Sequence, residues 1–304
     1  MKKLITYLNL LLIGLLLFGC DKPAPTELFD DSSEESAQYE VLSKDLGNDF
    51  YSNGFDTTGV TQDLNSLVNL ISVSGIKVTR ANGMTDRFSI AQTIFFDKSK
   101  PIFYTDGRLL AYQTITPGII RFDNIMSRIV PFRIHYKDNG MLRDTLLGNR
   151  YILYSGRHGG MDQFHYRHNS FINFRINVFN GNEANFNILT PKEVFGQVHL
   201  QGSRNNKDLR AVLNWNKADA GKFSIILGAR LRNREKVMPL FRVRTNDDGE
   251  LIVPARFIAK IPFDRFDKLV FTFIRRFEHH EQVDANNDLY ISSQSIHSIT
   301  VNYP

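Results

Sequence analysis

The sequence predicts an all-β protein, and three observations support this expectation. Ile, Phe, Ile and Val alternate with Asn, Arg and Asn over residues 172–178, which is the pattern of a strand with one buried and one solvated face. The chain contains 24 Phe and 11 Tyr, side chains that favour pleated, half-buried surfaces. Turn signals such as Asn139-Gly140 and Asp248-Gly249 separate the apolar runs, and strands joined by such short turns pair antiparallel.

Residues 1–20 have the layout of an export signal. Lys2 and Lys3 open the chain, an apolar run covers residues 4–18, and Gly19 precedes Cys20. A charged start, a short apolar run and a small residue before the cleavage point are the parts of a signal peptide. Because the run is shorter than the roughly 20 apolar residues that a membrane-spanning helix needs, we expect a signal peptide here and not a membrane span.

The segment Leu17-Phe18-Gly19-Cys20 resembles the lipobox of bacterial lipoproteins, although Phe18 is bulkier than the residue usually found there. The resemblance implies that Cys20 becomes the lipidated first residue of the mature protein, with acyl chains such as palmitate as the membrane anchor. Cys20 is the sole cysteine of the chain, which agrees with a dedicated use and excludes an intramolecular disulfide. The alternative is an ordinary signal peptide with an incidental cysteine.

Residues 21–57 are expected to form a disordered acidic linker. This stretch holds ten Asp or Glu against two Lys, a net charge of −8, and its few apolar residues follow no period. Low hydrophobicity combined with high charge predicts disorder, and like charges extend such a linker. Since the whole chain carries +5 and the signal +2, residues 58–304 carry +11. We therefore expect an acidic tether followed by a basic body.

Two sorting signals are compatible with the residues after Cys20. Asp21 resembles the inner-membrane retention signal of enterobacterial lipoproteins, whereas the acidic residues beyond it resemble the surface-export signals of Bacteroidota lipoproteins. Both alternatives stay open. The expected location is the cell envelope, with the outer membrane favoured over the inner membrane.

The body is expected to contain two antiparallel β-sandwich-like domains, because it is long for a single sandwich. The turn-rich stretch 180–191 marks the boundary, which gives an N-terminal β domain over residues 58–190 and a C-terminal domain over residues 191–304. Helical spacing occurs only at residues 64–71 and 257–261, and neither run is long enough to set the fold.

Seven short strands are predicted after residue 190, a number that fits an immunoglobulin-like or fibronectin-III-like sandwich. They cover Val194–Gln201, Leu209–Trp215, Lys222–Arg232, Pro239–Thr245, Glu250–Pro254, Leu269–Phe277 and Ser295–Asn302. Residues 211–216, 248–254 and 296–301 resemble strands of the small Ig-like modules of bacterial surface proteins, which implies an architecture and no particular activity. Trp215 alternates in register with Ala211 and Leu213, so we expect it in the core.

Two stretches contain side chains of the types that bind metal ions. The first contains His158, Asp162, His165 and His168, but on a strand the last two would point to opposite faces and could not share an ion. The second contains Asp284, Asn286 and Asp288, which match the opening of a calcium loop, although Leu289 replaces the expected glycine. For both stretches the favoured interpretation is a solvated turn without a metal.

A basic face is the remaining candidate site. On one predicted strand and its extension, cations recur at every second position, and two more follow on the next strand, so a hairpin would place all six on one face. These residues are Arg230, Arg232, Arg234, Lys236, Arg242 and Arg244. They are candidates for binding an anionic polymer, and the alternative is the ordinary charged outer face of a sandwich.

Common catalytic and phosphate-binding motifs, such as G-x-S-x-G, H-E-x-x-H and the P-loop, do not occur in the sequence. We therefore expect a lipid-anchored cell-envelope protein that acts as a non-enzymatic binding or structural module without a cofactor. Its expected partners are the membrane, through lipidated Cys20, and an anionic glycan or another envelope protein, and no nucleic acid. The alternative is a metal-assisted hydrolase of envelope or extracellular glycans that uses the region from His158 to His168.

Overall fold

The computed structural model confirms the all-β prediction over the residues that it describes, which are 37–42, 68–156, 164–218, 221–232, 237–259, 261–284 and 287–302. Within these ranges one short helix, α2 (Ala255–Ile258), accompanies the strands. In chain order the strands are β1 (Gln38–Val41), β2 (Asn69–Thr79), β3 (Thr85–Phe103), β4 (Leu109–Ile115), β5 (Gly118–Phe122), β6 (Ile125–Met126), β7 (Arg128–Asp138), β8 (Met141–Ser155), β9 (Phe171–Val178), β10 (Glu183–Leu189), β11 (Gly196–Gln201), β12 (Arg210–Trp215), β13 (Lys222–Leu231), β14 (Val237–Thr245), β15 (Glu250–Val253), β16 (Phe266–Asp284) and β17 (Asn287–Val301).

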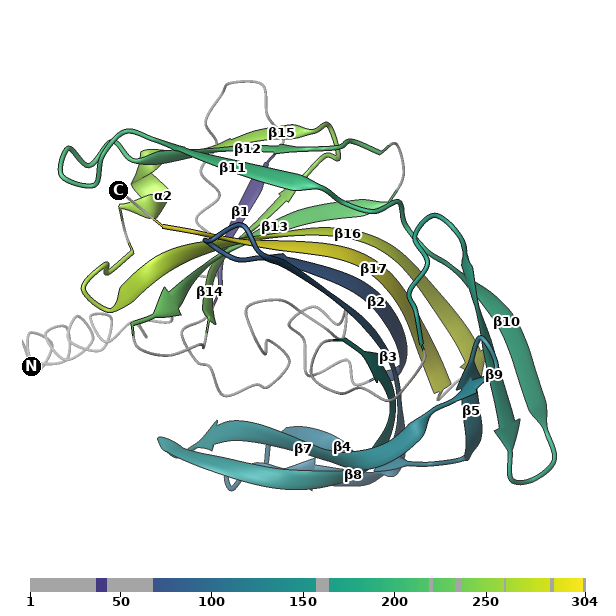
Figure 1. The fold of residues 1–304 in the computed structure, drawn as a ribbon. Coiled ribbons are helices and arrows are strands. Elements are labelled where there is room, and N and C mark those ends of the chain that lie inside the picture. Colours follow the sequence, from purple (N-terminus) through teal and green to yellow (C-terminus); the bar gives the residue numbers. More distant parts are fainter. Residues whose placement is uncertain are drawn as a thin grey trace, which may run out of the picture. The chain divides into compact units, whose positions relative to one another are not determined.

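One large, curved sheet carries the fold (Figure 1). Its strands follow the order β1-β14-β13-β16-β17-β2-β3-β8-β7, and β4 pairs with β3 beside this path. It contains strands from both sides of the expected domain boundary at residues 190 and 191. The two halves of the body are therefore joined by continuous hydrogen-bonded pairing and not only by a linker.

The junction between the halves is a parallel pair, β17 with β2, in register from Leu289 opposite Asn69 to Ile299 opposite Thr79. The expectation of purely antiparallel sheets is wrong at this pair. The turns that supported the expectation fix the direction only of strands that follow each other in the chain. Because β2 and β17 lie near opposite ends of the sequence, no short turn constrains them.

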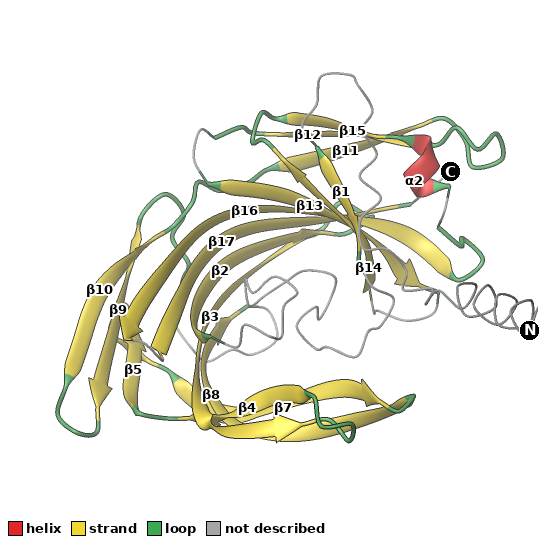
Figure 2. Ribbon diagram, turned by 180° about the vertical axis from the view of Figure 1, so that it is seen from behind, coloured by secondary structure: helices red, strands yellow, loops and turns green. Residues whose placement is uncertain are grey.

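Two smaller sheets cover the same face of the large sheet (Figure 2). One has the order β11-β12-β15 and the other β10-β9-β5-β6. The first closes an apolar core over β13, β14 and β16 that contains Trp215, and the second closes another core over β2, β3 and β8 that contains Phe174. The core-facing positions of β13 and β17 are odd-numbered, such as Ile225 and Ile299, and even-numbered side chains such as Ile226 lie on the opposite face.

The seven strands predicted after residue 190 are all present, with ends that differ from the prediction mainly in β16 and β17. Both of these strands run further than expected, to Asp284 and from Asn287. The added part of β17 includes Ser292, Ser293 and Gln294, all buried in the sheet. Such polar residues are typical of loops, so this part of the strand could not be recognised from the sequence.

Part of the expected disordered linker is ordered, which corrects that prediction for residues 37–42. Gln38–Val41 form β1, an antiparallel edge strand on β14. Tyr39 stacks on Phe257 with ring centroids 4.2 Å apart, and Leu42 is buried. These apolar contacts and a cross-strand pair, Glu40 opposite Arg242, hold a segment that its overall composition marks as disordered. The rest of the 21–57 stretch, and Cys20, lie outside the described residues.

The two segments with helical spacing, residues 64–71 and 257–261, differ in the structure. Ile71, which belonged to the first, lies in β2, so the described part of that run is extended and the hint is wrong there. The second hint corresponds to the single turn of α2, whose Phe257 and Ile258 are buried. Across the described ranges, no helix has the length and apolar content needed to cross a membrane.

Candidate functional site

Basic side chains converge on one face of the large sheet where β14, β13 and β16 lie side by side. Arg244 of β14 pairs with Ser224 of β13, and Lys222 of β13 pairs with Arg276 of β16. Arg242 lies two positions before Arg244 on the same face, as the alternation of strand side chains requires. This is the face opposite the two smaller sheets, so four cations project away from the apolar cores.

These four cations line a pocket of about 710 Å³, which we call the cationic pocket. Its volume lies within the range of about 300 to 1,000 Å³ that is typical of small-molecule sites. Lys217 also lines it, together with Asp248 and Glu278. The pocket therefore combines several guanidinium and ammonium groups with enough space for a ligand of drug-like size.

Glu278 neutralises one side of the cationic pocket. Its carboxylate forms ion pairs with Lys222 at 2.5 Å and with Arg276 at 3.0 Å. Burial by itself would raise the pKa of Glu278, but the hydrogen bond from Lys222 and the charge of Arg276 hold the pKa below its usual value. Glu278 is thus an ionised carboxylate that fixes the positions of two cations.

Glu40 of β1 approaches the other side of the pocket. Its Oε2 lies 3.8 Å from Nη1 of Arg242 and 3.5 Å from Nη2 of Arg244. The Arg242 side chain is only 3% exposed, whereas that of Arg244 is 53% exposed. Arg244 is consequently the member of this pair that a ligand from solvent can reach.

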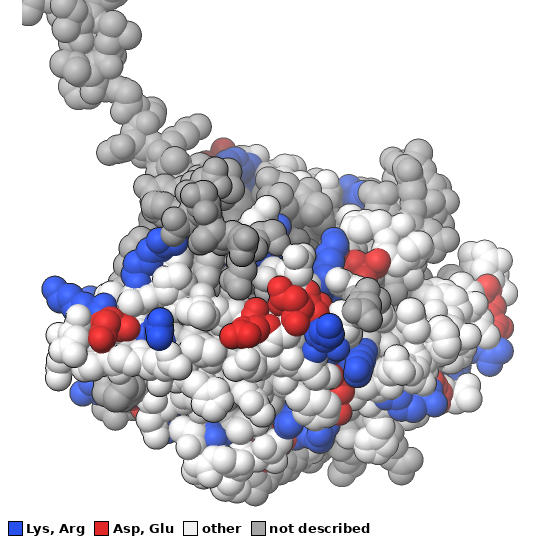
Figure 3. All heavy atoms as spheres, turned by 90° about the horizontal axis from the view of Figure 1, so that it is seen from above, with Lys and Arg blue, Asp and Glu red and all other residues white. Residues whose placement is uncertain are grey.

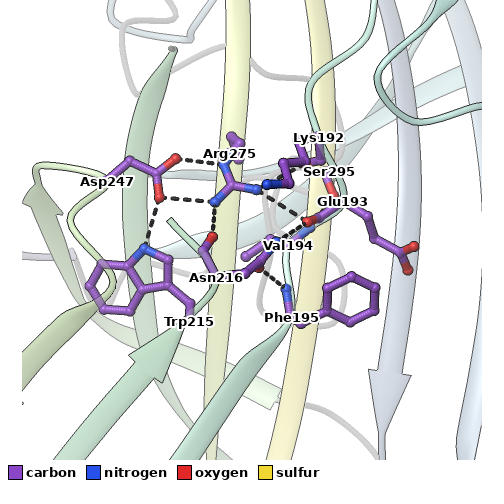
Figure 4. A network of polar contacts seen from close by, with 9 residues as sticks. All are labelled: Lys192, Glu193, Val194, Phe195, Trp215, Asn216, Asp247, Arg275 and Ser295. Atoms are coloured by element: carbon purple, nitrogen blue, oxygen red, sulfur yellow. Dashed lines mark hydrogen bonds and ion pairs between the residues drawn. The ribbon is translucent and has the colours of Figure 1, made fainter. Parts of the chain in front are cut away.

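Asp247 also lines the pocket, but its charge is neutralised by Arg275, which does not line the pocket. Buried Arg275 donates two hydrogen bonds to Asp247 and others to the backbone carbonyl oxygens of Lys192 and Asn216 (Figure 4). The indole N–H of Trp215 donates to the same carboxylate at 2.8 Å. This network connects the segment before β11 to the large sheet, and it neutralises the negative charge of Asp247.

The Asp247–Arg275 pair is neutral and is left out of the charge count. Five basic and three acidic side chains then line or adjoin the cationic pocket. They are Lys217, Lys222, Arg242, Arg244 and Arg276 with Glu40, Asp248 and Glu278. The site keeps an excess of two positive charges. On the face shown in Figure 3, basic groups lie beside acidic groups instead of forming one basic field.

The six cations predicted from the sequence are only partly brought together. Arg242 and Arg244 belong to the cationic pocket, whereas Arg230 forms a two-pronged ion pair with Asp267. Arg232 is exposed at the end of β13. Arg234 and Lys236 lie outside the described residues.

Lys222, Arg276 and Lys217 were not predicted as site residues. Lys222 and Arg276 occupy positions on their strands whose side chains point away from the apolar core. This alternation is the one signal in the sequence that could have identified them as site residues. Their contribution depends on β16 being the neighbour of β13, an order that the alternation of side chains does not reveal.

The predicted metal candidates do not form a cluster where they can be described. His158, Asp162 and Asn286 lie outside the described residues, and Asp284 and Asp288 are placed only by their backbone in the β16–β17 hairpin. His165 and His168 are not on a strand as expected, because β9 begins only at Phe171. His165 is exposed and His168 half-buried against the ring of Tyr166. In the part of the chain that is described, no three His, Cys, Asp or Glu side chains could hold a metal ion together.

No family model, no curated protein and no solved structure matches this chain.

Proposed function

We propose that this chain is a lipid-anchored protein of the cell envelope that binds anionic groups in the cationic pocket. The observation that carries the binding proposal is the convergence of Lys222, Arg242, Arg244 and Arg276 around a space of about 710 Å³. Guanidinium groups bind carboxylate and phosphate in a bidentate manner. The ligand class is therefore a carboxylate- or phosphate-bearing molecule, such as an acidic glycan or a phosphorylated envelope component.

The envelope location and the anchor rest on the lipobox-like segment ending at Cys20 and on the acidic stretch that follows it. Between Cys20 and β1 lie residues 21–37, which at roughly 3.3 Å per residue span at most about 56 Å. In this proposal the tether keeps the cationic pocket within reach of molecules at the membrane surface.

We also propose that residues 191–304 form an immunoglobulin-like sandwich, with Bacteroidota-type surface modules as the resembling class. Support comes from the packing of β11, β12 and β15 over β13, β14 and β16, with Trp215 and Phe273 in the core between them. This architecture serves as a rigid support for the pocket and does not by itself indicate a ligand.

The test replaces two exposed cations of the pocket, Lys222 and Arg244, which are 77% and 53% exposed. The full chain with Lys222→Gln and Arg244→Gln is compared on a heparin column with a control that carries Lys100→Gln and Arg133→Gln. The control residues are similarly exposed, at 58% and 56%, and lie away from the pocket. We expect the pocket variant to elute at clearly lower salt than the control, although both lose two charges. Equal elution would remove the cationic pocket as the binding site.

A further inference from the structure

A second pocket, of about 610 Å³, adjoins the cationic pocket. Four residues line both spaces, namely Gly221, Lys222, Arg276 and Glu278. The remaining wall of the second space comes from three strands and is mostly apolar, with Asn187, His279 and Ser293 as its polar members. Its apolar members are Phe186, Ile188 and Leu189 of β10, Phe277 of β16 and Ile291 of β17. We call this space the apolar pocket.

The apolar pocket exists because β13 stops while its neighbour continues. The β13–β16 ladder ends at the pair Lys222 and Arg276, but β16 extends to Asp284 with β17 on its other side. Arg276 and Glu278 share one face of β16, and Phe277 points to the opposite face. The two pockets consequently meet around the end of β13, with the cations on one side and the aromatic and aliphatic side chains on the other.

Gly221 is required at this junction. It has a φ of +99°, and a Cβ at this position would lie 2.8 Å from the carbonyl oxygen of Arg276 and 2.9 Å from the ring of Phe277. Both the backbone conformation and the close approach favour glycine. The chain therefore passes closely over β16 where the two pockets meet, and any larger residue would push into this junction.

We propose that the ligand of this site is an anionic amphiphile, with its phosphate or carboxylate headgroup in the cationic pocket and its hydrocarbon tail in the apolar pocket. This inference rests on the proposed function, which it extends from an anionic group to a class of molecule. A headgroup held by Lys222 and Arg276 lies at the mouth of the apolar pocket, because these residues line both spaces. Phe186, Leu189 and Phe277 offer no hydrogen-bond partner to a polar group, whereas a hydrocarbon tail can pack against all three.

The surface chemistry on β10 agrees with this occupant. Leu189 is 47% exposed and lines the apolar pocket, so a bound tail would remove apolar surface from water. Charge complementarity selects the sign of the headgroup, since the neighbouring cationic pocket carries the excess of positive charge described above. A neutral lipid would fill the apolar pocket but would leave the excess positive charge of the cationic pocket without a counter-charge.

The experiment is a chain-length series on the full chain, captured on a sensor surface in detergent-free buffer. The probes are ethyl, butyl, hexyl and octyl phosphate. We expect affinity to rise about fourfold for each added methylene that enters the apolar pocket. With Leu189→Gln, the affinity for octyl phosphate should fall severalfold and that for ethyl phosphate should stay unchanged. The matched control is Leu146→Gln on β8, since Leu146 is 49% exposed and lies outside both pockets.

The outcomes separate the two proposals. If ethyl phosphate binds and octyl phosphate binds no more tightly, the amphiphile inference is overturned while anion binding stands. If Leu146→Gln weakens octyl phosphate as much as Leu189→Gln does, the tail does not lie in the apolar pocket and the inference is likewise overturned. If no phosphate in the series binds, or if Lys222→Gln with Arg244→Gln leaves the binding of ethyl phosphate unchanged, the proposed function itself fails.

Discussion

Arg275 and Asp247 form a buried ion pair in which Nε and Nη2 of the guanidinium lie 2.6 Å and 2.9 Å from the two carboxylate oxygens. The two side chains are only 1% and 6% exposed. Two charges can be buried in this way only when each satisfies the other and the remaining donors find carbonyl oxygens, as they do here.

Asp247→Asn should therefore destabilise the protein strongly, because it leaves the Arg275 charge buried without a counter-charge. We expect a loss of about 3 to 5 kcal/mol in the free energy of unfolding, measured by chemical denaturation. Asp144→Asn is the matched control, since Asp144 and its partner Arg133 are 45% and 56% exposed. An exposed pair contributes about 1 kcal/mol or less. Equal losses in the two variants would contradict a structural role for the buried pair.

Trp215→Ala should cost about 3 to 5 kcal/mol of stability, as other deletions of large core side chains do. Trp215 is 7% exposed, stacks on Phe223 with ring centroids 4.6 Å apart and donates its indole N–H to Asp247. It is the sole tryptophan of the chain, so its fluorescence reports on this site alone. We expect a blue-shifted, poorly quenched emission, and a red-shifted, readily quenched emission would place the ring in water.

The stability of the fold should depend on pH through His297. Nδ1 of this buried ring accepts the backbone N–H of Gly196 at 2.9 Å, and Nε2 lies 2.9 Å from Oγ1 of Thr79. Burial, followed by the positive charges of Lys77 and Arg87, lowers the pKa of His297 to about 4. A proton on Nδ1 would face the N–H group that this atom now accepts, so the folded protein resists protonation.

The sign of the effect follows from comparing the two states. In the unfolded chain the pKa of a histidine is about 6.5, so between pH 6.5 and pH 4 the unfolded chain binds a proton that the folded chain does not. The contribution of His297 is complete above this window and is lost as the pH falls through it, by about 3 kcal/mol in total. His297→Gln should flatten this part of the stability profile, while His199→Gln, at an exposed position, should leave it as it is.

Glu40→Gln should strengthen the binding of anions. The carboxylate of Glu40 lies within 4 Å of both Arg242 and Arg244, where it repels an incoming anion and offsets the charge that attracts it. We expect the variant to elute from heparin at higher salt than Glu183→Gln. This control removes the same charge from an exposed pair with Arg175. If the two variants elute together, Glu40 does not compete with the ligand.

Cys20→Ser should release the protein from membranes without unfolding its body, because it removes the proposed site of lipidation and no residue of the described fold. Membrane fractions washed with high salt should retain the unchanged chain and lose the variant. Retention of the variant after this wash would show that something other than lipid at Cys20 holds the protein.

The strands could be predicted from sequence better than their arrangement. Alternation located the strand that ends in Trp215 and the hairpin that carries Arg242 and Arg244, because one face of each strand is apolar. It failed for Ser292 and Gln294, since a sheet that buries polar side chains on both faces resembles a loop in the sequence. It also failed for Glu40, whose strand has too few apolar residues to stand out from its acidic surroundings.

Side-chain alternation predicted part of the candidate site and missed the rest. Parity placed Arg242 and Arg244 on a common face, but it could not show that Arg230 is held by Asp267. Nor could it show that β16 brings Arg276 next to Lys222, because neighbours in a sheet are chosen by packing among distant segments. Side-chain periodicity is a local property of the chain, whereas the pocket is a product of strand order.

The pairing of β2 with β17 has a consequence for how the protein is made. Their paired residues are about 220 positions apart, so the centre of the large sheet cannot form until nearly the whole chain has been synthesised. Until then β2 has a long unpaired edge, which is a hazard for aggregation, and contacts between such distant segments form slowly. A chain of this design needs protection until its last strand arrives, and holding chaperones that recognise extended segments are the kind of factor suited to that interval.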